Sequence, residues 1–148
     1  MIRKKDDVVG SLLHDAAHLL RLRIDEALRP YDLTRVSWMA IGIIEQNEML
    51  TQSDLAARLE LGTAATGKLV DRLQERGLVE RHDDPEDRRA NLLAVTPGAR
   101  DLLERLKSVG EALREEVLQD LGEAERRQLQ RSLQKIKTRL TESRSQAA

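Results

Sequence analysis

The sequence predicts a mainly α-helical protein with one small antiparallel β element. Its 148 residues include no phenylalanine, three prolines and 1% aromatic residues. Core volume must therefore come from leucine, alanine, valine and isoleucine, which favour or tolerate helix. Apolar residues recur at helical spacing near both ends of the chain, and two short strand-like segments lie between these regions. A chain of this length forms about one domain.

The N-terminal part of the chain predicts two helices. Apolar residues at steps of three and four indicate one long helix, which ends before Pro30 because the proline ring disfavours helix in the preceding residue. Thr34 is suited to cap a second helix, which fades near Asn47. The stripe of the first helix consists of Val9, Leu13, Ala16, Leu20, Ile24 and Ala27.

Two short helices joined by a tight turn follow. Thr51 and Asp54 fit a capping box, in which each side chain accepts a hydrogen bond from the backbone amide of the other residue. Gly62 belongs to the turn, and a further helix runs from about Thr63 to Arg76. Gly77 is suited to end that helix in the left-handed conformation. This arrangement is typical of a helix-turn-helix.

A predicted hairpin follows the helix pair directly. Leu78–His82 and Asn91–Val95 are short strand-like segments, and a polar loop containing Pro85 joins them. A hairpin in this position is the wing of a winged helix-turn-helix. Its tip carries two arginines that core packing does not need.

Two amphipathic helices are expected to complete the chain. Thr96 as N-cap and Pro97 at the first helical position open one of them, and the other follows Gly122. Both have heptad-like apolar stripes, which usually contact other helices. The two stripes consist of Leu102, Leu106, Val109, Leu113 and Val117, and of Leu129, Leu133, Ile136 and Leu140.

Composition and motifs exclude several classes of protein. The chain has no cysteine, which removes disulfides and thiolate metal sites and fits a cytoplasmic setting. No run of about 18 apolar residues predicts a membrane span, and the N-terminus does not fit a signal peptide. No Gly-rich phosphate loop or known nucleophile motif is present, so we expect neither an enzyme nor a cofactor. The net charge of −1 means that DNA binding would depend on one basic surface.

The helix from Thr63 to Arg76 is the candidate for contact with DNA bases. A helical projection places Ala65, Leu69, Val70 and Leu73 on the buried side and Thr63, Ala64, Gly67, Lys68 and Asp71 on the outer side. Small residues near the helix start suit entry into a major groove about 12 Å wide. Gly67 costs about 1 kcal/mol of helix stability relative to alanine. Close approach to DNA would explain this glycine, and a tight packing contact is the alternative.

The wing offers a second candidate contact. A guanidinium at the hairpin tip, from Arg88 or Arg89, can enter a narrow minor groove, where the potential is most negative. A carboxylate such as Asp71 or Asp87 could hold and orient one of them. The alternative is a solvated turn in which both arginines pair with the neighbouring acids.

Three segments of the chain together resemble the multiple-antibiotic-resistance regulator (MarR) family. They are Leu69–Arg81, Asp84–Ala90 and Leu93–Gly98, and Leu33-Thr34 with Trp38 further suggests SlyA-like members. The resemblance covers nearly the whole chain. It implies obligate homodimers that pair through their terminal helices and place two recognition helices in successive major grooves of double-stranded DNA.

The resemblance also implies roles for individual residues. Thr63, Ala64 and Lys68 would meet bases or phosphates, Arg89 would enter the minor groove braced by Asp71, and the helix start at 51–53 would touch phosphate. Many members differ at Ala64, Ala65 and Lys68, so the operator sequence cannot be transferred. The complete predicted DNA-binding set is Thr51, Gln52, Ser53, Thr63, Ala64, Gly67, Lys68, Arg72, Arg88 and Arg89, with Asp71 and Asp87 as bracing acids.

Family members often bind small phenolic or carboxylate compounds, and the positions of such a site here are His14, His18, Arg21, Trp38 and Ile41. His18 matches a basic residue that serves the ligand carboxylate in SlyA-like relatives, and its binding would depend on pH. Trp38 alternatively fills core between helices. His14 and His18 lie one helical turn apart, but without further ligands of clear spacing we predict no metal site.

We therefore expect a DNA-binding transcriptional regulator, a repressor by family analogy, released from a pseudo-palindromic operator by a small ligand. Residues 1–33 would form the N-terminal part of the dimerisation helices, 34–95 the DNA-binding domain and 96–148 the C-terminal dimerisation helices. The main alternative is a helical protein-interaction module that does not bind DNA. That alternative gives no account of an arginine-tipped hairpin directly after a short helix pair.

Overall fold

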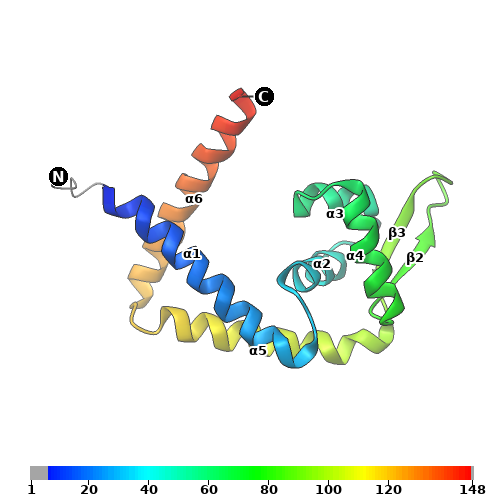
Figure 1. Cartoon of the computed structure of the whole chain (residues 1–148), viewed down its shortest axis with the longest axis horizontal. Helices are drawn as coiled ribbons and strands as arrows, with labels where there is room; N and C mark the ends of the chain where they lie inside the picture. The colour runs from blue at the N-terminus through cyan, green and yellow to red at the C-terminus, as the bar shows by residue number, and fades with distance from the viewer. Residues whose placement is uncertain (1–6, 148) are drawn as a thin grey trace. The chain divides into compact units, whose positions relative to one another are not determined.

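The computed structural model describes residues 7–147 and confirms the mainly helical fold with a small antiparallel sheet. Figure 1 shows the elements coloured along the chain. In chain order they are α1 (Asp7–Leu28), η1 (Arg29–Tyr31), α2 (Arg35–Gln46), β1 (Leu50–Thr51), α3 (Gln52–Leu59), α4 (Thr63–Glu75), β2 (Val79–Asp83), β3 (Asn91–Val95), η2 (Pro97–Ala99), α5 (Arg100–Leu118) and α6 (Glu123–Ala147).

The chain divides into two compact units, Met1–Val109 and Gly110–Ala148. The first unit contains α1 to α4, the sheet and the first part of α5, and the second contains the rest of α5 with α6. The functional division predicted at residues 33 and 95 stays a prediction. None of the helices within residues 7–147 is long and apolar enough to span a membrane.

Local capping signals set the helix boundaries. The Thr34 hydroxyl accepts a hydrogen bond from the Ser37 amide (3.1 Å), which starts α2 as predicted. The predicted capping box at α3 is also confirmed, with the Asp54 amide 3.0 Å from the Thr51 hydroxyl and the Thr51 amide 3.1 Å from the Asp54 carboxylate. These contacts satisfy amides at the helix start that have no partner within the helix.

Gly77 ends α4 in the way that the sequence predicts. Its φ is +68°, a left-handed conformation that glycine adopts without steric cost. The Gly77 amide donates to the Gln74 carbonyl and the Leu78 amide to the Leu73 carbonyl, both at 2.9 Å. This pair of bonds is a Schellman motif, and it turns the chain directly into the wing.

The wing is part of a three-stranded antiparallel sheet of order β1-β3-β2. β2 pairs with β3 from Val79 opposite Val95 to Asp83 opposite Asn91, one residue later than predicted for the first strand. β1 was not predicted: a two-residue strand carries no periodicity, and only its pairing of Leu50 with Leu93 defines it. This pairing attaches the segment before α3 to the wing.

The core of the first unit lies between α2, α3, α4 and the sheet, with the end of α1 and the start of α5 contributing (Figure 1). Trp38 is half-buried and packs against this core, which supports the core-filling alternative for its role. The largest fully buried side chains are Leu28, Ile41, Leu55, Thr66, Val70, Leu73, Val79 and Leu106.

The start of α5 differs from the prediction. Residues 97–99 form a 3-10 turn, and the Thr96 side chain makes no capping bond. The Thr96 hydroxyl instead donates to the Gly77 carbonyl at 2.5 Å, and this hydrogen bond joins the two ends of the hairpin. In α5, Leu103 is buried although the predicted stripe did not include it, whereas Leu102 of that stripe is only partly buried. The side chain of Lys107 pairs with Glu45 at 3.3 Å and so ties α5 to α2.

Replacing Thr51 by alanine should remove one half of the capping box. We expect Thr51→Ala to lower the free energy of unfolding by about 1 kcal/mol, because the Asp54 amide loses its acceptor. Urea denaturation followed by circular dichroism measures this difference. Thr51→Ser keeps the hydroxyl and should stay within a few tenths of a kcal/mol of wild type. Equal losses in both variants would contradict the assignment.

The capping box should also make stability depend on pH. Hydrogen bonds from the Thr51 side chain and then from its backbone hold the pKa of Asp54 below its ordinary value of 3.8. A carboxylate with a lowered folded-state pKa stabilises the fold above the unfolded-state value and loses this contribution as the pH falls. The difference in unfolding free energy between wild type and Asp54→Asn should therefore be constant at neutral pH and shrink in acid. The exposed Asp15→Asn serves as control, and a difference that persists unchanged in acid would rule out this mechanism.

Candidate nucleic-acid interface

Helix α4 presents one buried and one exposed side. Thr66, Leu69, Val70 and Leu73 face the core, and the opposite side is exposed. Because a helix repeats every 3.6 residues, these four buried positions fix which residues face outward. The exposed residues of α4 are Thr63, Ala64, Ala65, Lys68, Asp71, Arg72, Gln74 and Glu75.

The structure corrects the predicted buried edge at the start of α4. Ala65 is exposed, and Thr66 takes the core position with no exposed surface. The Thr66 hydroxyl donates to the Gly62 carbonyl one turn earlier (2.9 Å), so its polar atom is satisfied while its methyl group packs inside. Two neighbouring alanines, Ala64 and Ala65, therefore lie on the exposed face at the first turn of α4, and the side chains there are smaller than predicted.

The start of α3 lies beside α4 but is partly occupied by internal contacts. Thr51 caps the helix, as described above. The Gln52 side-chain carbonyl accepts two hydrogen bonds from Arg81, at 3.1 and 3.2 Å. Ser53 is exposed. A Cβ on Gly67 would lie 3.4 Å from the side-chain amide nitrogen of Gln52, an ordinary contact with the end of a flexible side chain, so packing at this point does not require glycine.

The wing tip exposes its two arginines. The Asp84 carboxylate accepts from the Glu86 amide and the Asp87 carboxylate from the Arg89 amide, both at 2.9 Å, and these bonds shape the turn. Within the described residues, the guanidinium groups of Arg88 and Arg89 form no ion pair with the loop acids. The solvated turn in which arginines and acids pair is therefore not the arrangement found. Lys68 and Arg72 are exposed cations of the same unit.

Asp71, predicted to brace Arg89, pairs with a different arginine. Its carboxylate lies 2.8 Å from the Arg81 guanidinium. The sequence did not lead us to predict a role for Arg81, although the alternation of side chains between the two faces of a strand offered a signal. Val79 is buried, and a residue two positions later on the same strand points to the same side. A charged side chain in that position requires a partner, which Asp71 supplies.

The predicted ligand residues fall into two groups. His14, His18 and Arg21 are exposed on α1, whereas Ile41 of α2 is 1% exposed and belongs to the core. Ile41 therefore cannot line an open cavity in this arrangement, and the ligand site stays a prediction. Within residues 7–147 there is no cluster of three or more His, Cys, Asp or Glu side chains that could hold a metal ion.

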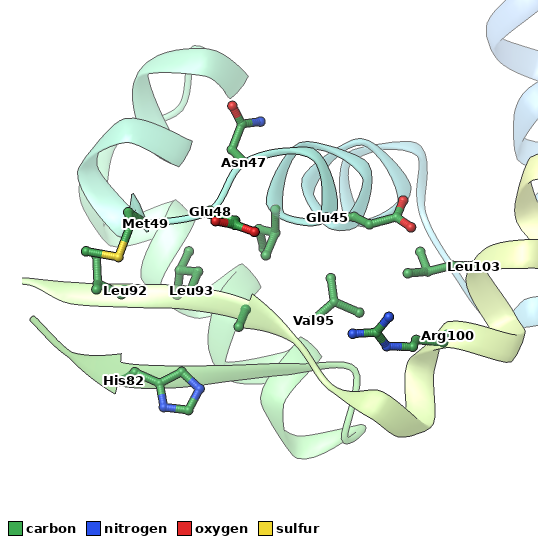
Figure 2. A pocket seen from close by; sticks show the side chains of 12 residues that line it. Glu45, Asn47, Glu48, Met49, His82, Leu92, Leu93, Val95, Arg100 and Leu103 are labelled. Atoms are coloured by element: carbon green, nitrogen blue, oxygen red, sulfur yellow. The ribbon is translucent and has the colours of Figure 1, made fainter.

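A groove of about 590 Å³ lies elsewhere in the same unit, between the end of α2, strand β3 and the start of α5. Figure 2 shows the carboxylates of Glu45 and Glu48 on the α2 side and the Arg100 guanidinium on the α5 side. Leu92, Leu93, Val95 and Leu103 provide apolar lining. The groove shares no residue with the predicted ligand set, and its mixed charges do not indicate one class of ligand.

Comparison with known proteins agrees with this geometry. A model of the MarR family matches residues 31–90. A transcriptional regulator (MarR family) from Rhodococcus sp. RHA1 is 29% identical, with a TM-score of 0.79 over 91% of this chain and 96% of that chain. A mutant MarR from E. coli complexed with operator DNA is 28% identical, with a TM-score of 0.78 over 86% and 92%. The S. aureus MepR–DNA complex is 24% identical, with a TM-score of 0.78 over 87% and 96%, and shows the fold alone.

A short helix pair followed by a sheet with an exposed hairpin tip defines a winged helix-turn-helix protein. Residues 31–90 match the MarR family, and the fold of the chain is similar to that of a transcriptional regulator of this family. Membership of the SlyA-like branch stays a prediction.

Proposed function

We propose that this protein binds specific DNA sequences as a homodimer and represses transcription from a pseudo-palindromic operator. The observation that carries the proposal is the pair of exposed surfaces in one compact unit. These are the outer face of α4, small at its start and with Lys68 projecting, and the wing tip with Arg88 and Arg89. The solved complexes of E. coli MarR with operator DNA and of S. aureus MepR with DNA support this use of the fold.

In this proposal α4 enters the major groove and the wing reaches the neighbouring minor groove. Thr63, Ala64 and Lys68 face the bases or phosphates, and Ala65 adds to the small surface that allows close approach. Arg89 occupies the minor groove, where a guanidinium gains most from the negative potential. Two copies would contact half-sites about 10–10.5 bp apart, one helical turn of DNA.

Exposed apolar side chains on the terminal helices support a homodimer. In the single chain, Leu12 and Leu19 of α1 are 61% and 60% exposed, and Leu140 of α6 is 62% exposed. Leu129 and Leu133 of α6 are also exposed, in heptad-like spacing. Apolar rows of this kind are typical of surfaces that pack against other helices. The proposed partner for these rows is a second copy of the chain.

A small phenolic or carboxylate ligand is the proposed effector, bound near His18 and Arg21 on α1. Such a ligand would act by favouring a spacing of the two recognition helices that does not match successive grooves. Its effect can be no larger than the difference between its affinities for the two arrangements.

The first test is a fluorescence titration of the protein against labelled DNA from upstream of its own gene, at several salt concentrations. Saturable binding that resists competition by random duplex supports the proposal, and affinity should fall steeply with salt. If no genomic or randomised duplex is preferred over random DNA, the protein-interaction module becomes the better account.

Removal of the wing arginine should weaken specific binding. We expect Arg89→Ala to raise the dissociation constant for the preferred duplex by about 10- to 100-fold, with the dimer unchanged in sedimentation. Lys68→Ala should cost about as much if it contacts a base edge, or flatten the salt dependence if it contacts phosphate. Arg105→Ala, an exposed arginine of α5, is the matched control. An unchanged affinity in Arg89→Ala would remove the wing from the interface.

A charge in the apolar row of α6 should disrupt the dimer. Leu133 is 41% exposed in the single chain, and burial at a two-fold interface would involve two copies of it. We expect Leu133→Asp to raise the dimer dissociation constant by at least about 100-fold, from the loss of two buried leucines. Analytical ultracentrifugation measures this change, and circular dichroism checks the fold. The neighbouring exposed Gln134→Asp should leave the dimer intact, and a dimeric Leu133→Asp would place the interface elsewhere.

A further inference from the structure

We propose that Arg81 is a positioning residue that fixes the wing to the recognition helix α4. On this proposal Arg81 sets the distance between the two DNA-contacting surfaces without touching DNA itself. The inference rests on the proposed function, because it concerns how accurately two parts of one DNA-binding unit are held together.

All three nitrogens of the Arg81 guanidinium are engaged within the protein, by four hydrogen bonds and one ion pair. Nε and Nη2 donate to the Gln52 side-chain carbonyl at 3.2 and 3.1 Å. Nη2 also donates to the Gly67 carbonyl at 3.3 Å. Nη1 donates to the Gln74 side-chain carbonyl at 2.7 Å and lies 2.8 Å from the Asp71 carboxylate. A guanidinium has five donors in a rigid planar fork, so these partners engage most of its capacity.

These acceptors come from two helices, and Arg81 itself comes from the wing. Gln52 is the first residue of α3, whereas Gly67, Asp71 and Gln74 span the length of α4. Arg81 lies in the middle of β2, where it pairs with Leu93 of β3. Because the fork is planar and rigid, the three elements cannot rotate independently without breaking several bonds at once. The strand pairing carries this constraint along the hairpin toward its tip.

The burial of Arg81 agrees with an internal role. Its side chain is 21% exposed, whereas the Asp71 side chain is 59% exposed. Withdrawing a guanidinium from water is costly unless a counter-charge and hydrogen bonds replace the lost solvation, and both are present here. A DNA phosphate could recruit Arg81 only by displacing an existing acceptor.

Gly67 fits the same arrangement. Its carbonyl accepts from Arg81, and a Cβ on this residue would lie 3.4 Å from the side-chain amide nitrogen of Gln52. A small residue at this point therefore leaves room for Gln52 to lie between α3 and α4 with its carbonyl toward Arg81. The same contact limits the availability of Gln52 for phosphate.

The test compares Arg81→Lys and Arg81→Gln with wild type on two DNA probes. One probe is a duplex selected by the wild-type protein from a random pool, and the other is an unselected duplex of equal length. Lysine keeps the charge but lacks the planar fork. We expect both variants to lose about tenfold in affinity for the selected duplex, to bind the unselected duplex as wild type does, and to keep the wild-type salt slope.

A direct phosphate contact would give a different result. Arg81→Lys would then retain most of the affinity, and Arg81→Gln would weaken both probes alike and reduce the salt slope by about 0.9. That outcome would overturn the proposal. Arg127→Lys is the matched control, since Arg127 forms a single exposed pair with Glu123 (2.7 Å) in the second unit.

A double-mutant cycle tests whether Asp71 acts through Arg81. Asp71→Asn should reproduce the loss of preference for the selected duplex, and the double variant Asp71→Asn with Arg81→Lys should be little worse than either single variant. Additive losses would mean that the two residues act separately. Gln74→Ala removes only one acceptor of Arg81, so we expect a smaller loss of preference for the selected duplex. This variant tests the proposal if the larger changes prevent folding.

Hydrogen exchange separates failure of this inference from failure of the proposed function. In Arg81→Lys without DNA, the amides of β2 and β3 should exchange faster than in wild type, while those of α5 should not change. Unchanged exchange in the hairpin would overturn the positioning role whether or not the protein binds DNA. If the wild-type protein prefers no duplex, the proposed function is refuted. The exchange result then still tests whether Arg81 positions the wing.

Discussion

The burial of one side of α4 is the constraint on which the rest of this structure depends. Thr66, Leu69, Val70 and Leu73 all face the core, and three of them are at most 1% exposed. These four positions cover about one third of the helix circumference, so their burial fixes the rotation of α4 about its own axis. The remaining residues of α4 form its outer face. A substitution that weakened this burial would change which residues face outward, even if the helix itself persisted.

Polar contacts then fix the ends of α4 relative to the neighbouring elements. Beyond the last turn, Arg76 donates to the backbone carbonyls of Tyr31 and Asp32, at 3.0 and 2.5 Å. The end of the helix is thereby attached to the segment between α1 and α2. Along its side, Arg81 attaches the helix to α3 and to the wing. Apolar packing alone orients a helix about its axis, whereas these directional bonds also limit movement along it.

The distribution of charge explains how an acidic chain can offer a basic surface. The net charge is −1, but several charged side chains of the first unit are paired with one another, as in Asp71 with Arg81 and Asp25 with Arg35. Within the described residues, Lys68, Arg72, Arg88 and Arg89 make no such pair and are exposed. Two opposite charges in close contact largely cancel at a distance, so the exposed cations without such a pair determine what an approaching polyanion meets.

The sequence by itself determined the features that depend on neighbouring residues. The Thr51–Asp54 capping box, the left-handed Gly77 and the hairpin around Pro85 each involve groups within a few residues, where side-chain chemistry and allowed backbone angles decide the outcome. Only the tertiary structure decided the exchange of Ala65 for Thr66 in the core, the strand β1 and the partners of Arg81. Gln52 and Arg81 are far apart along the chain, and no local pattern specifies which carbonyl meets which guanidinium. The physical reason is that such contacts form only after several elements have packed, so packing geometry selects the partners.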